Sequence, residues 1–493
     1  MDPTQIHKIA INTTKSSGHP APRHPPAPHE PPQHAPAARH EIPRMARPAK
    51  EYAARLTQEL GRGAGTSIIK LVDALVECAY SARASDVHLD PREDGVTVRL
   101  RIDGVLQDIA LVPTEIHHEV ISRLKILCGL RTDEHQAAQD GRFKVTLRPS
   151  AAMTERERGN TEASRLNVGS TEASRPNVED GANVDVRTSI VPTYYGENAV
   201  LRLLSDQAEE FTLDTLGFTP ENRERIERAI RKPHGMILAT GPTGSGKTTT
   251  LYTLVKMLNT PDVSIITIED PIEYSVSGIN QIQVNARTGL TFANGLRSML
   301  RQDPNIIMVG EIRDMDTAGL AVNTALTGHL VLSTLHTNDA PTTLPRLLDM
   351  KVEPYLIAST VNIAIGQRLV RKICEDCKEE KMNTPAEEKS LSEIMPQELA
   401  SAGGGSAIGG RAMFYSGAGC DRCNGTGYLG RAGLHEVMVI DGPIREAILR
   451  KASASEIRDI ALTQGMKSLV VDGFHKAAEG MTTIEEVLRM RYE

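Results

Sequence analysis

The 493-residue chain has no tryptophan, few aromatic residues and no long apolar run. Phe, Tyr and Trp make up 3% of it, which argues against the aromatic platforms on which single-stranded nucleic acids stack. No stretch approaches the roughly 20 apolar residues of a membrane-spanning helix. The first residues also lack the apolar core of a secretory signal. We therefore expect a cytoplasmic protein that reaches a membrane only through partners.

The chain also has a small net charge and few cysteines. The chain has 56 Lys and Arg against 63 Asp and Glu, a balance that argues against a general nucleic-acid binder, although a local basic patch is compatible with it. Of six cysteines, Cys78 and Cys128 stand alone in apolar helical patterns and are expected to pack as small core residues. The other four form two C-x-x-C pairs. In a cytosolic protein such pairs suggest metal or redox chemistry more than structural disulfides.

Composition divides the N-terminal part of the chain. Residues 1–50 are rich in Pro, His and Ala and predict a disordered, extended arm, with a metal-binding tract as the alternative. Residues 51–205 predict a small α+β domain with a helix over 67–82 and strands from 96 onward. Residues 150–183 interrupt it with TEASRLNV and its near copy TEASRPNV. Two polar copies cannot bury a core, so we predict an insertion in a hairpin loop.

The remaining chain predicts three further regions. Residues 206–370 alternate helices with apolar strands at 236–240, 264–268, 305–309 and 330–334, which indicates an α/β domain with a mainly parallel sheet. Residues 371–430 contain the paired cysteines and a Gly/Ser-rich insertion. Residues 431–493 predict a C-terminal helical region, with helices from about 442.

The stretch GPTGSGKTT fits the phosphate-loop pattern between an apolar strand and a helix. Glycines let the backbone turn tightly and point N–H groups at phosphates, and the helix N-terminus adds partial positive charge. Lys247 is expected at the β- and γ-phosphates, and the Thr248 hydroxyl on Mg²⁺. The alternative is a glycine-rich turn with a chance lysine. The predicted nucleotide-binding residues are Gly241, Pro242, Thr243, Gly244, Ser245, Gly246, Lys247, Thr248 and Thr249.

Two acidic clusters follow apolar strands, in IEDPIE and in MVGEIRD. Because ligands of open α/β sheets bind beyond the carboxyl ends of strands, these acids can meet a nucleotide. We predict that Glu269 and Asp270 associate with Mg²⁺ and that Glu273 and Glu311 are catalytic, Glu311 by activating the attacking water. The alternative for each acid is a solvated loop position. The usual Asp before such a Glu is Gly310 here.

A histidine follows the apolar strand at 330–334. His336 is therefore expected near the strand's carboxyl end, where it could sense the γ-phosphate by hydrogen bonding. The alternative for a single histidine is a core position. We predict a catalytic role for His336.

Four elements occur in a specific order: the phosphate loop, IEDPIEY, MVGEIRD and TGHLVLSTLHTNDA. Through these four elements the chain resembles the secretion ATPases of type II secretion and type IV pilus assembly. The resemblance covers residues from about 65 to 493, without the insertions. Gly310 is what this family carries. The resemblance implies an α/β fold: a RecA-like P-loop NTPase core preceded by a small α+β domain, with a tetracysteine zinc subdomain and C-terminal helices.

The resemblance also implies a homohexameric ring that binds ATP. In it, the small domain lends arginines to the nucleotide, whose transition-state charge a guanidinium can stabilise. The matching stretches RLRIDGVL and DVRTSIVPTYYGENAVLRLL make Arg101 and Arg187 the candidates, with Arg202 behind them.

The paired cysteines, Cys374, Cys377, Cys420 and Cys423, can hold a tetrahedral Zn²⁺, each pair on one side. The following NGTGYLGRAGLHEVM is similar to the tetracysteine region of assembly ATPases, whereas retraction ATPases usually lack these cysteines. A redox pair is the alternative.

The resemblance implies a motor that assembles a type IV pilus or a type II secretion pseudopilus through an inner-membrane platform protein. Such a motor is cytoplasmic and peripheral at the inner face of the cell membrane. The alternatives are a retraction motor, a nucleic-acid translocase of the conjugation type, and a nucleotide-gated scaffold without turnover. Many family members carry a further N-terminal docking domain where this chain has its Pro/His arm, so cyclic-dinucleotide control is not expected.

Overall fold

The computed structural model describes residues 54, 56–60, 67–147, 182–205, 211–382 and 414–490. The predicted arm over 1–50 and almost all of the predicted insertion over 150–183 lie outside these residues. Within the described ranges, no helix combines the length and the apolar character needed to cross a bilayer.

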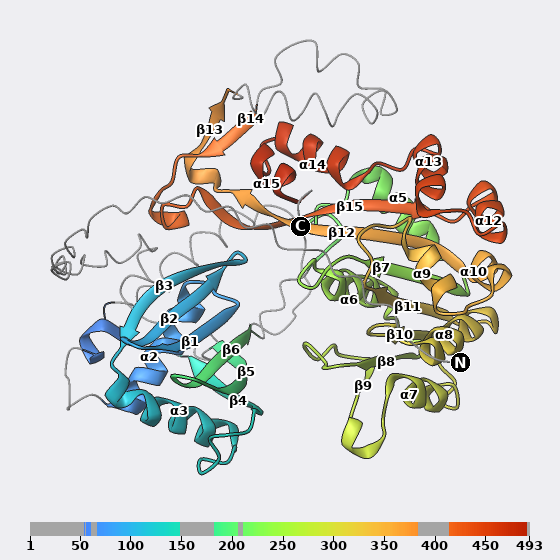
Figure 1. Ribbon diagram of the computed structural model, residues 1–493. Helices are drawn as coiled ribbons and strands as arrows, with labels where there is room; N and C mark the ends of the chain where they lie inside the picture. Colours follow the sequence, from blue (N-terminus) through green and yellow to red (C-terminus); the bar gives the residue numbers. More distant parts are fainter. Residues whose placement is uncertain are drawn as a thin grey trace, which may run out of the picture. The chain divides into compact units, whose positions relative to one another are not determined.

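The N-terminal domain is a six-stranded antiparallel sheet with helices on one face (Figure 1). The strand order is β3-β2-β1-β6-β5-β4. Alternate residues of each strand, such as Val96 and Val98 of β2, are buried against Leu75 and Leu124 of the helices. The elements are α2 (Ile68–Ser81), β1 (Asp86–Arg92), β2 (Gly95–Ile102), β3 (Val105–Val112), α3 (Thr114–Cys128), β4 (Gln139–Leu147), β5 (Ala182–Thr193) and β6 (Gly196–Ser205).

Two hairpins of this sheet follow from local sequence. Asp103 and Gly104 join β2 to β3 with φ of 49° and 86°, the left-handed conformation that a two-residue type I′ turn requires at both positions. Strands β4 and β5 pair as far as Leu147 opposite Ala182. The TEASR repeat therefore joins two residues that face each other across a ladder.

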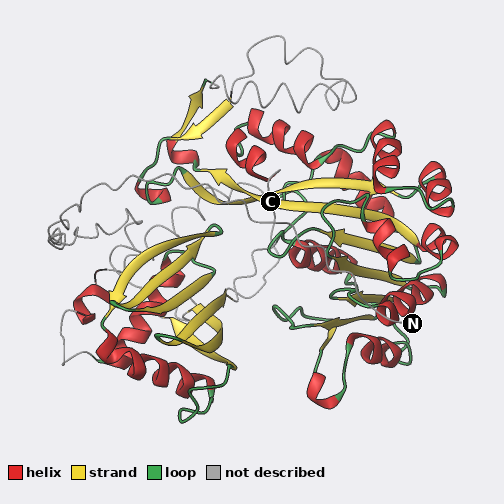
Figure 2. Ribbon diagram, viewed as in Figure 1, coloured by secondary structure: helices red, strands yellow, loops and turns green. Residues whose placement is uncertain are grey.

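The second domain is built on a seven-stranded sheet, whose strands are yellow in Figure 2 and labelled in Figure 1. The strand order is β15-β12-β7-β11-β10-β8-β9. All neighbouring pairs are parallel except β12 with β15. Strand β7 lies between β11 and β12, so the loop after β7 leaves from the interior of the sheet. The strands are β7 (Gly235–Thr240), β8 (Ile265–Glu269), β9 (Asn280–Gln283), β10 (Ile306–Val309), β11 (Leu330–Leu335), β12 (Val361–Ile373) and β15 (Tyr428–Val439).

Helices cover both faces of this sheet because its central strands are apolar on both sides. In β7, Met236 and Leu238 belong to one buried cluster, and Ile237 and Ala239 belong to the other. The first cluster packs under α7 (Phe292–Met299), α8 (Met315–Leu326), α9 (Thr343–Asp349), α10 (Pro354–Thr360), α12 (Gly442–Leu449) and α13 (Ala454–Thr463). The second packs under α5 (Pro220–Ile230) and α6 (Lys247–Leu258).

The strands expected at 236–240, 264–268, 305–309 and 330–334 correspond to β7, β8, β10 and β11. A difference appears beyond them. Strand β15, from a stretch expected in the zinc and C-terminal helical regions, pairs along β12 from Val439 opposite Ile363 to Tyr428 opposite Ile373. The seven-stranded sheet therefore includes a strand that follows the cysteine region in sequence.

A small module sits between β12 and β15 in sequence. It contains η3 (Glu375–Cys377), η4 (Asp421–Cys423) and a two-stranded ladder of β13 (Lys378–Lys381) and β14 (Phe414–Gly417). Helices α14 (Leu469–Ala478) and α15 (Ile484–Met490) pack beside it, with Phe474 meeting Phe414 edge to face at 5.4 Å.

Candidate active site and metal centre

The phosphate loop, residues 241–248, connects the end of β7 to the start of α6. Gly241, Gly244 and Gly246 have φ of 148°, 79° and 86°, in the region that L side chains rarely adopt. Space also requires glycine at position 241, since a Cβ there would lie 2.4 Å from the backbone carbonyl oxygen of Gln367. Pro242, Thr243, Gly244 and Thr248 are exposed, whereas Ser245 and Lys247 are buried. The loop thus leaves the threonine side chains 243 and 248 exposed together with Gly244, so hydroxyl and backbone groups are open to a phosphate.

Lys247 is folded back onto its own loop. Its Nζ donates to the carbonyl oxygens of Gly241 and Pro242, each at 2.9 Å. Burial lowers the pKa of Lys247 to about 8, an effect that nearby Glu311 opposes and Arg368 reinforces. A buried ammonium that donates to two carbonyl oxygens can exchange them for the oxygens of an anionic phosphate.

Hydroxyl groups tie the loop to its neighbours. Thr250 donates to Oε1 of Gln367 on β12 at 2.7 Å. On the other side, the backbone N–H of Thr337 donates to Oγ1 of Thr240 at 3.1 Å. The segment that follows His336 is therefore anchored to the strand that carries the phosphate loop.

The catalytic candidates Glu311 and His336 are in contact. Oε2 of Glu311 lies 3.1 Å from Nε2 of His336 and 2.5 Å from Nε of Arg313. The backbone is fixed on both sides, because Ile312 N–H donates to Thr334 O at 3.0 Å and Asp314 caps α8 through Thr317 N–H at 2.8 Å. Glu311 is buried and His336 is exposed. The adjacent ends of β10 and β11 thus bring a carboxylate and an imidazole together beside Lys247.

The acidic box, residues 269–273, splits into different environments. Glu269 is 2% exposed and receives hydrogen bonds from protein groups, whereas Asp270 is exposed. Glu273 is partly exposed and pairs with Arg187, whose Nη1 lies 3.1 Å from its Oε2. Arg187 also donates to the carbonyl oxygen of Ile272. Of the two predicted arginines, Arg187 therefore meets a predicted catalytic acid.

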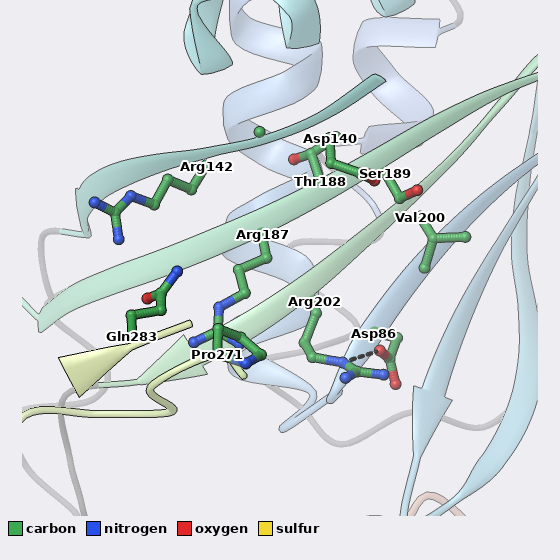
Figure 3. Close-up of a pocket in the computed structure, with 11 residues that line it drawn as sticks. Asp86, Asp140, Arg142, Arg187, Thr188, Ser189, Val200, Arg202, Pro271 and Gln283 are labelled. Carbon is green, nitrogen blue, oxygen red and sulfur yellow. Dashed lines mark hydrogen bonds and ion pairs between the residues drawn. The ribbon is translucent and has the colours of Figure 1, made fainter. Parts of the chain in front are cut away.

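Arginines of four small-domain strands, with Asp86 of β1 between two of them, form a row across the sheet; Figure 3 shows Arg142, Arg187, Arg202 and Asp86. The register pairs Arg101 with Asp86, Asp86 with Arg202, Arg202 with Arg187, and Arg187 with Arg142. This arginine row lies on the sheet face away from α2 and α3. Asp86 bridges two members, with Arg202 Nε at 3.0 Å and Arg101 Nε at 3.4 Å. Like charges directly opposite each other destabilise a sheet, so three adjacent arginines favour an anion on this face.

A pocket of about 520 Å³ opens beside this row. Its lining contains Arg142, Arg187 and Arg202 together with Pro271 and Gln283. Arg101 does not line it and instead donates from Nη1 to the carbonyl oxygen of Gly104 at 3.1 Å.

The four paired cysteines converge. Cys374, Cys377, Cys420 and Cys423 have all their sulfur atoms within 4.8 Å of one another. Sγ separations are 3.8 Å for Cys374–Cys420, 3.8 Å for Cys377–Cys423 and 3.7 Å for Cys420–Cys423. A tetrahedron of sulfurs about 2.3 Å from Zn²⁺ has an edge of about 3.8 Å, whereas a disulfide needs about 2.05 Å. The thiols therefore fit a zinc site.

Burial and backbone donors tune these thiols individually. Burial raises the pKa of Cys377 to about 12. At Cys423 burial is outweighed by backbone donors, and its pKa falls to about 7. The N–H groups of Cys420 and Gly427 each donate to Cys423 Sγ at 3.2 Å, which stabilises a thiolate.

Sequence reasoning did not single out Arg142, Gln367, Arg313 or Tyr252. The strand register of the QDGR stretch could have indicated Arg142, because it fixes which residue faces Arg187. No local sequence signal indicates Gln367, because its contact with Thr250 depends on β12 pairing beside β7.

Comparison with known proteins decides the family. The family model described as "Type II/IV secretion system protein" matches residues 63–157 and 175–489. The chain belongs to this family. Type IV pilus assembly ATPase PilB of Thermus thermophilus is 43% identical over 452 residues, which are 90% of this chain and 46% of that protein. Type II secretion system protein HxcR of Pseudomonas aeruginosa is 41% identical over 426 residues, 86% of this chain and 78% of that protein. The chain thus spans about half the length of the Thermus relative and most of HxcR.

Solved structures support the fold. DotB of Legionella pneumophila aligns with a TM-score of 0.56 at 21% identity, covering 85% of this chain and 95% of that one. The pilus retraction motor PilT with bound ADP aligns with a TM-score of 0.52 at 24% identity, covering 84% and 95%. The predicted fold class is confirmed: an α/β RecA-like core preceded by a small α+β domain, with four clustered cysteines. The family match, together with relatives that are named as ATPases, indicates an ATP-hydrolysing enzyme.

Proposed function

We propose that this family member hydrolyses ATP to power assembly of a type IV pilus or a type II secretion pseudopilus. The proposal rests on the meeting of Lys247, Glu311 and His336 at one edge of the sheet, in a chain whose relatives are named for these two machines. It acts as a homohexamer in the cytoplasm, peripheral to the membrane, against an inner-membrane platform protein.

Each side chain has a role in hydrolysis. The phosphate loop binds the β- and γ-phosphates through its N–H groups, and Lys247 exchanges its two carbonyl partners for phosphate oxygens. Glu311 orients and deprotonates the attacking water, and His336 holds that carboxylate and reports the γ-phosphate. Glu273 supports this chemistry from the acidic box.

The arginine row supplies positive charge from the small domain. Arg187, with Arg142 and Arg202 beside it, would stabilise the charge that builds on the transferred phosphoryl group. Arg187 then leaves Glu273, which frees that acid when nucleotide is bound. Arg101 is the more distant member and supports the row through Asp86.

Two metal ions belong to the proposal. Mg²⁺ fits Thr248 and Asp270, whose exposed oxygens lie at the phosphate loop and at the acidic box, and when bound it neutralises phosphate charge. Zn²⁺ fits the four cysteines and would hold the module that follows β12.

Filament assembly is tested in the cells that carry this protein. Glu311→Gln as the only copy should leave cells without surface pili in electron micrographs, or without exported proteins if the cargo is a pseudopilus. An excess of pili would contradict assembly and favour retraction, a function that the four cysteines argue against. DNA-stimulated hydrolysis by the purified protein would instead favour a translocase.

Hydrolysis itself is tested in vitro. Lys247→Ala should abolish phosphate release from ATP. Full activity in that variant, or a wild-type protein that holds nucleotide without turnover, would overturn the enzymatic role.

A further inference from the structure

The first acid of the acidic box is surrounded by protein donors. Oε1 of Glu269 accepts hydrogen bonds from Thr267 Oγ1 at 2.5 Å and from Gln281 Nε2 at 3.2 Å. Its Oε2 accepts from the phenol of Tyr252. With 2% of its surface exposed, this carboxylate fits a Mg²⁺ ion poorly, because Mg²⁺ keeps several waters in its shell.

Tyr252 stands at the junction of three segments. It belongs to α6, the helix that begins at Lys247, and is 1% exposed. Its hydroxyl donates to Glu269 and accepts from the backbone N–H of Glu273 at 3.3 Å. Its ring meets the ring of Tyr274 edge to face at 4.6 Å. One side chain therefore joins the phosphate-loop helix, the end of β8 and the acidic box.

The phenol is suited to a fixed structural role. Burial, and next Glu269, raise the pKa of Tyr252 above its ordinary value. It therefore stays a donor to Glu269, and its lone pair stays available to the N–H of Glu273. The hydrogen bonds define both the place of the Tyr252 ring and the place of the Glu273 backbone.

We propose that Tyr252 and Glu269 are a positioning pair that holds Glu273 in register with the phosphate loop. Glu269 acts through Tyr252 rather than as a ligand of Mg²⁺. This inference rests on the proposed ATP hydrolysis, in which Glu273 is a working acid. Displacement of Glu273 by a fraction of an ångström would slow the chemical step and leave nucleotide affinity unchanged.

Removal of one hydroxyl tests the pair. Tyr252→Phe keeps the ring and its edge-to-face contact, and should lower kcat about tenfold or more while KM for ATP stays within about twofold. The matched control is Tyr274→Phe, which removes the hydroxyl of the partner ring; within the described residues no hydrogen bond of that hydroxyl is found. A wild-type kcat in Tyr252→Phe would overturn the proposal.

A second measurement does not depend on turnover. Without nucleotide, amide hydrogen exchange over residues 270–276 should be about tenfold faster in Tyr252→Phe and unchanged in Tyr274→Phe, because the Glu273 N–H loses its acceptor. Unchanged exchange in Tyr252→Phe contradicts the pair even if the wild-type protein lacks ATPase activity. Failure of the proposed function would instead appear as an inactive wild type with the expected exchange pattern.

Glu269→Gln separates positioning from metal binding. Its Mg²⁺ concentration for half-maximal hydrolysis should stay within about twofold of the wild-type value, while kcat falls. A rise of about fivefold or more in that concentration would overturn the proposal and assign Glu269 to the Mg²⁺ site.

Discussion

Nε2 of His336 lies 3.1 Å from Oε2 of Glu311, and the two residues come from the ends of neighbouring parallel strands. The same oxygen accepts a hydrogen bond from Nε of Arg313 at 2.5 Å. A backbone hydrogen bond from Ile312 N–H to Thr334 O at 3.0 Å joins the two segments, and His336 and Arg313 together orient the carboxylate.

Loss of the His336 imidazole should therefore affect chemistry more than binding. His336→Ala should lower ATP hydrolysis by about ten- to a hundredfold, since Glu311 loses a donor that orients it. Phosphate release gives the rate, and a fluorescent nucleotide gives the affinity, which should change less than about threefold. His234→Ala, at an exposed loop histidine, is the matched control. A large loss of nucleotide affinity in His336→Ala would speak against this role.

The arginine row gives a prediction about residues on the small domain. Arg187→Ala and Arg142→Ala should each lower kcat by about tenfold or more, because positive charge at a phosphoryl-transfer transition state is lost. Arg228→Ala on α5 removes a surface arginine whose ion pair with Glu224 is largely exposed, and should change kcat little. Equal effects of all three variants would indicate a general electrostatic effect rather than contact with nucleotide.

The four-cysteine set should hold one metal ion per chain. Cys420→Ser should lose most of the zinc measured by atomic spectroscopy and lower the melting temperature, because the module after β12 loses its tether. Cys128→Ala removes a thiol outside the set and should keep full zinc content. An unchanged zinc content in Cys420→Ser would contradict the site.

Glu436 predicts a pH-dependent stability. This carboxyl of β15 is fully buried, its Oε1 accepts from Ala340 N–H at 2.9 Å, and burial raises its pKa from 4.5 to about 7. The folded chain thus keeps a proton that the unfolded chain releases between pH 4.5 and 7. The contribution of protonated Glu436 to the free energy of unfolding is complete below pH 4.5 and is lost as pH rises through 7.

Glu436→Gln should remove that dependence. Between pH 4.5 and pH 8, the unfolding free energy of the wild type should fall by on the order of 3 kcal/mol relative to that of Glu436→Gln. The melting temperature of the variant minus that of the wild type should therefore be higher at pH 8 than at pH 4.5. Glu446→Gln, at an exposed position of α12, should show no such trend. Parallel melting curves for Glu436→Gln and wild type across this range would contradict the raised pKa.

Sequence predicted those parts of the protein that depend on local pattern. The phosphate loop and the apolar strands before each acidic cluster combine a residue type with a periodicity, and each forms the expected element. The spacing of the cysteines also predicted their convergence.

Contacts between distant segments were harder to predict. Strand β15 joins β12 across the whole cysteine module, and no local signal distinguishes an apolar edge strand from a buried helix segment. Likewise, Glu269 and Asp270 are neighbours in sequence with similar side chains. Their exposure differs because β8 ends between them. Glu269 is the last residue of β8 and is buried, whereas Asp270 follows the strand and is exposed.

Two ladder ends have a practical consequence for engineering. Leu147 faces Ala182 at the end of β4 and β5, and Lys381 faces Phe414 at the end of β13 and β14. At each place the chain departs and returns at neighbouring backbone positions, so added length changes loop-closure entropy only slowly and leaves strand register intact. A fluorescent domain or an affinity handle grafted at either site should therefore leave the strands, the phosphate loop and the carboxylate–imidazole pair in place.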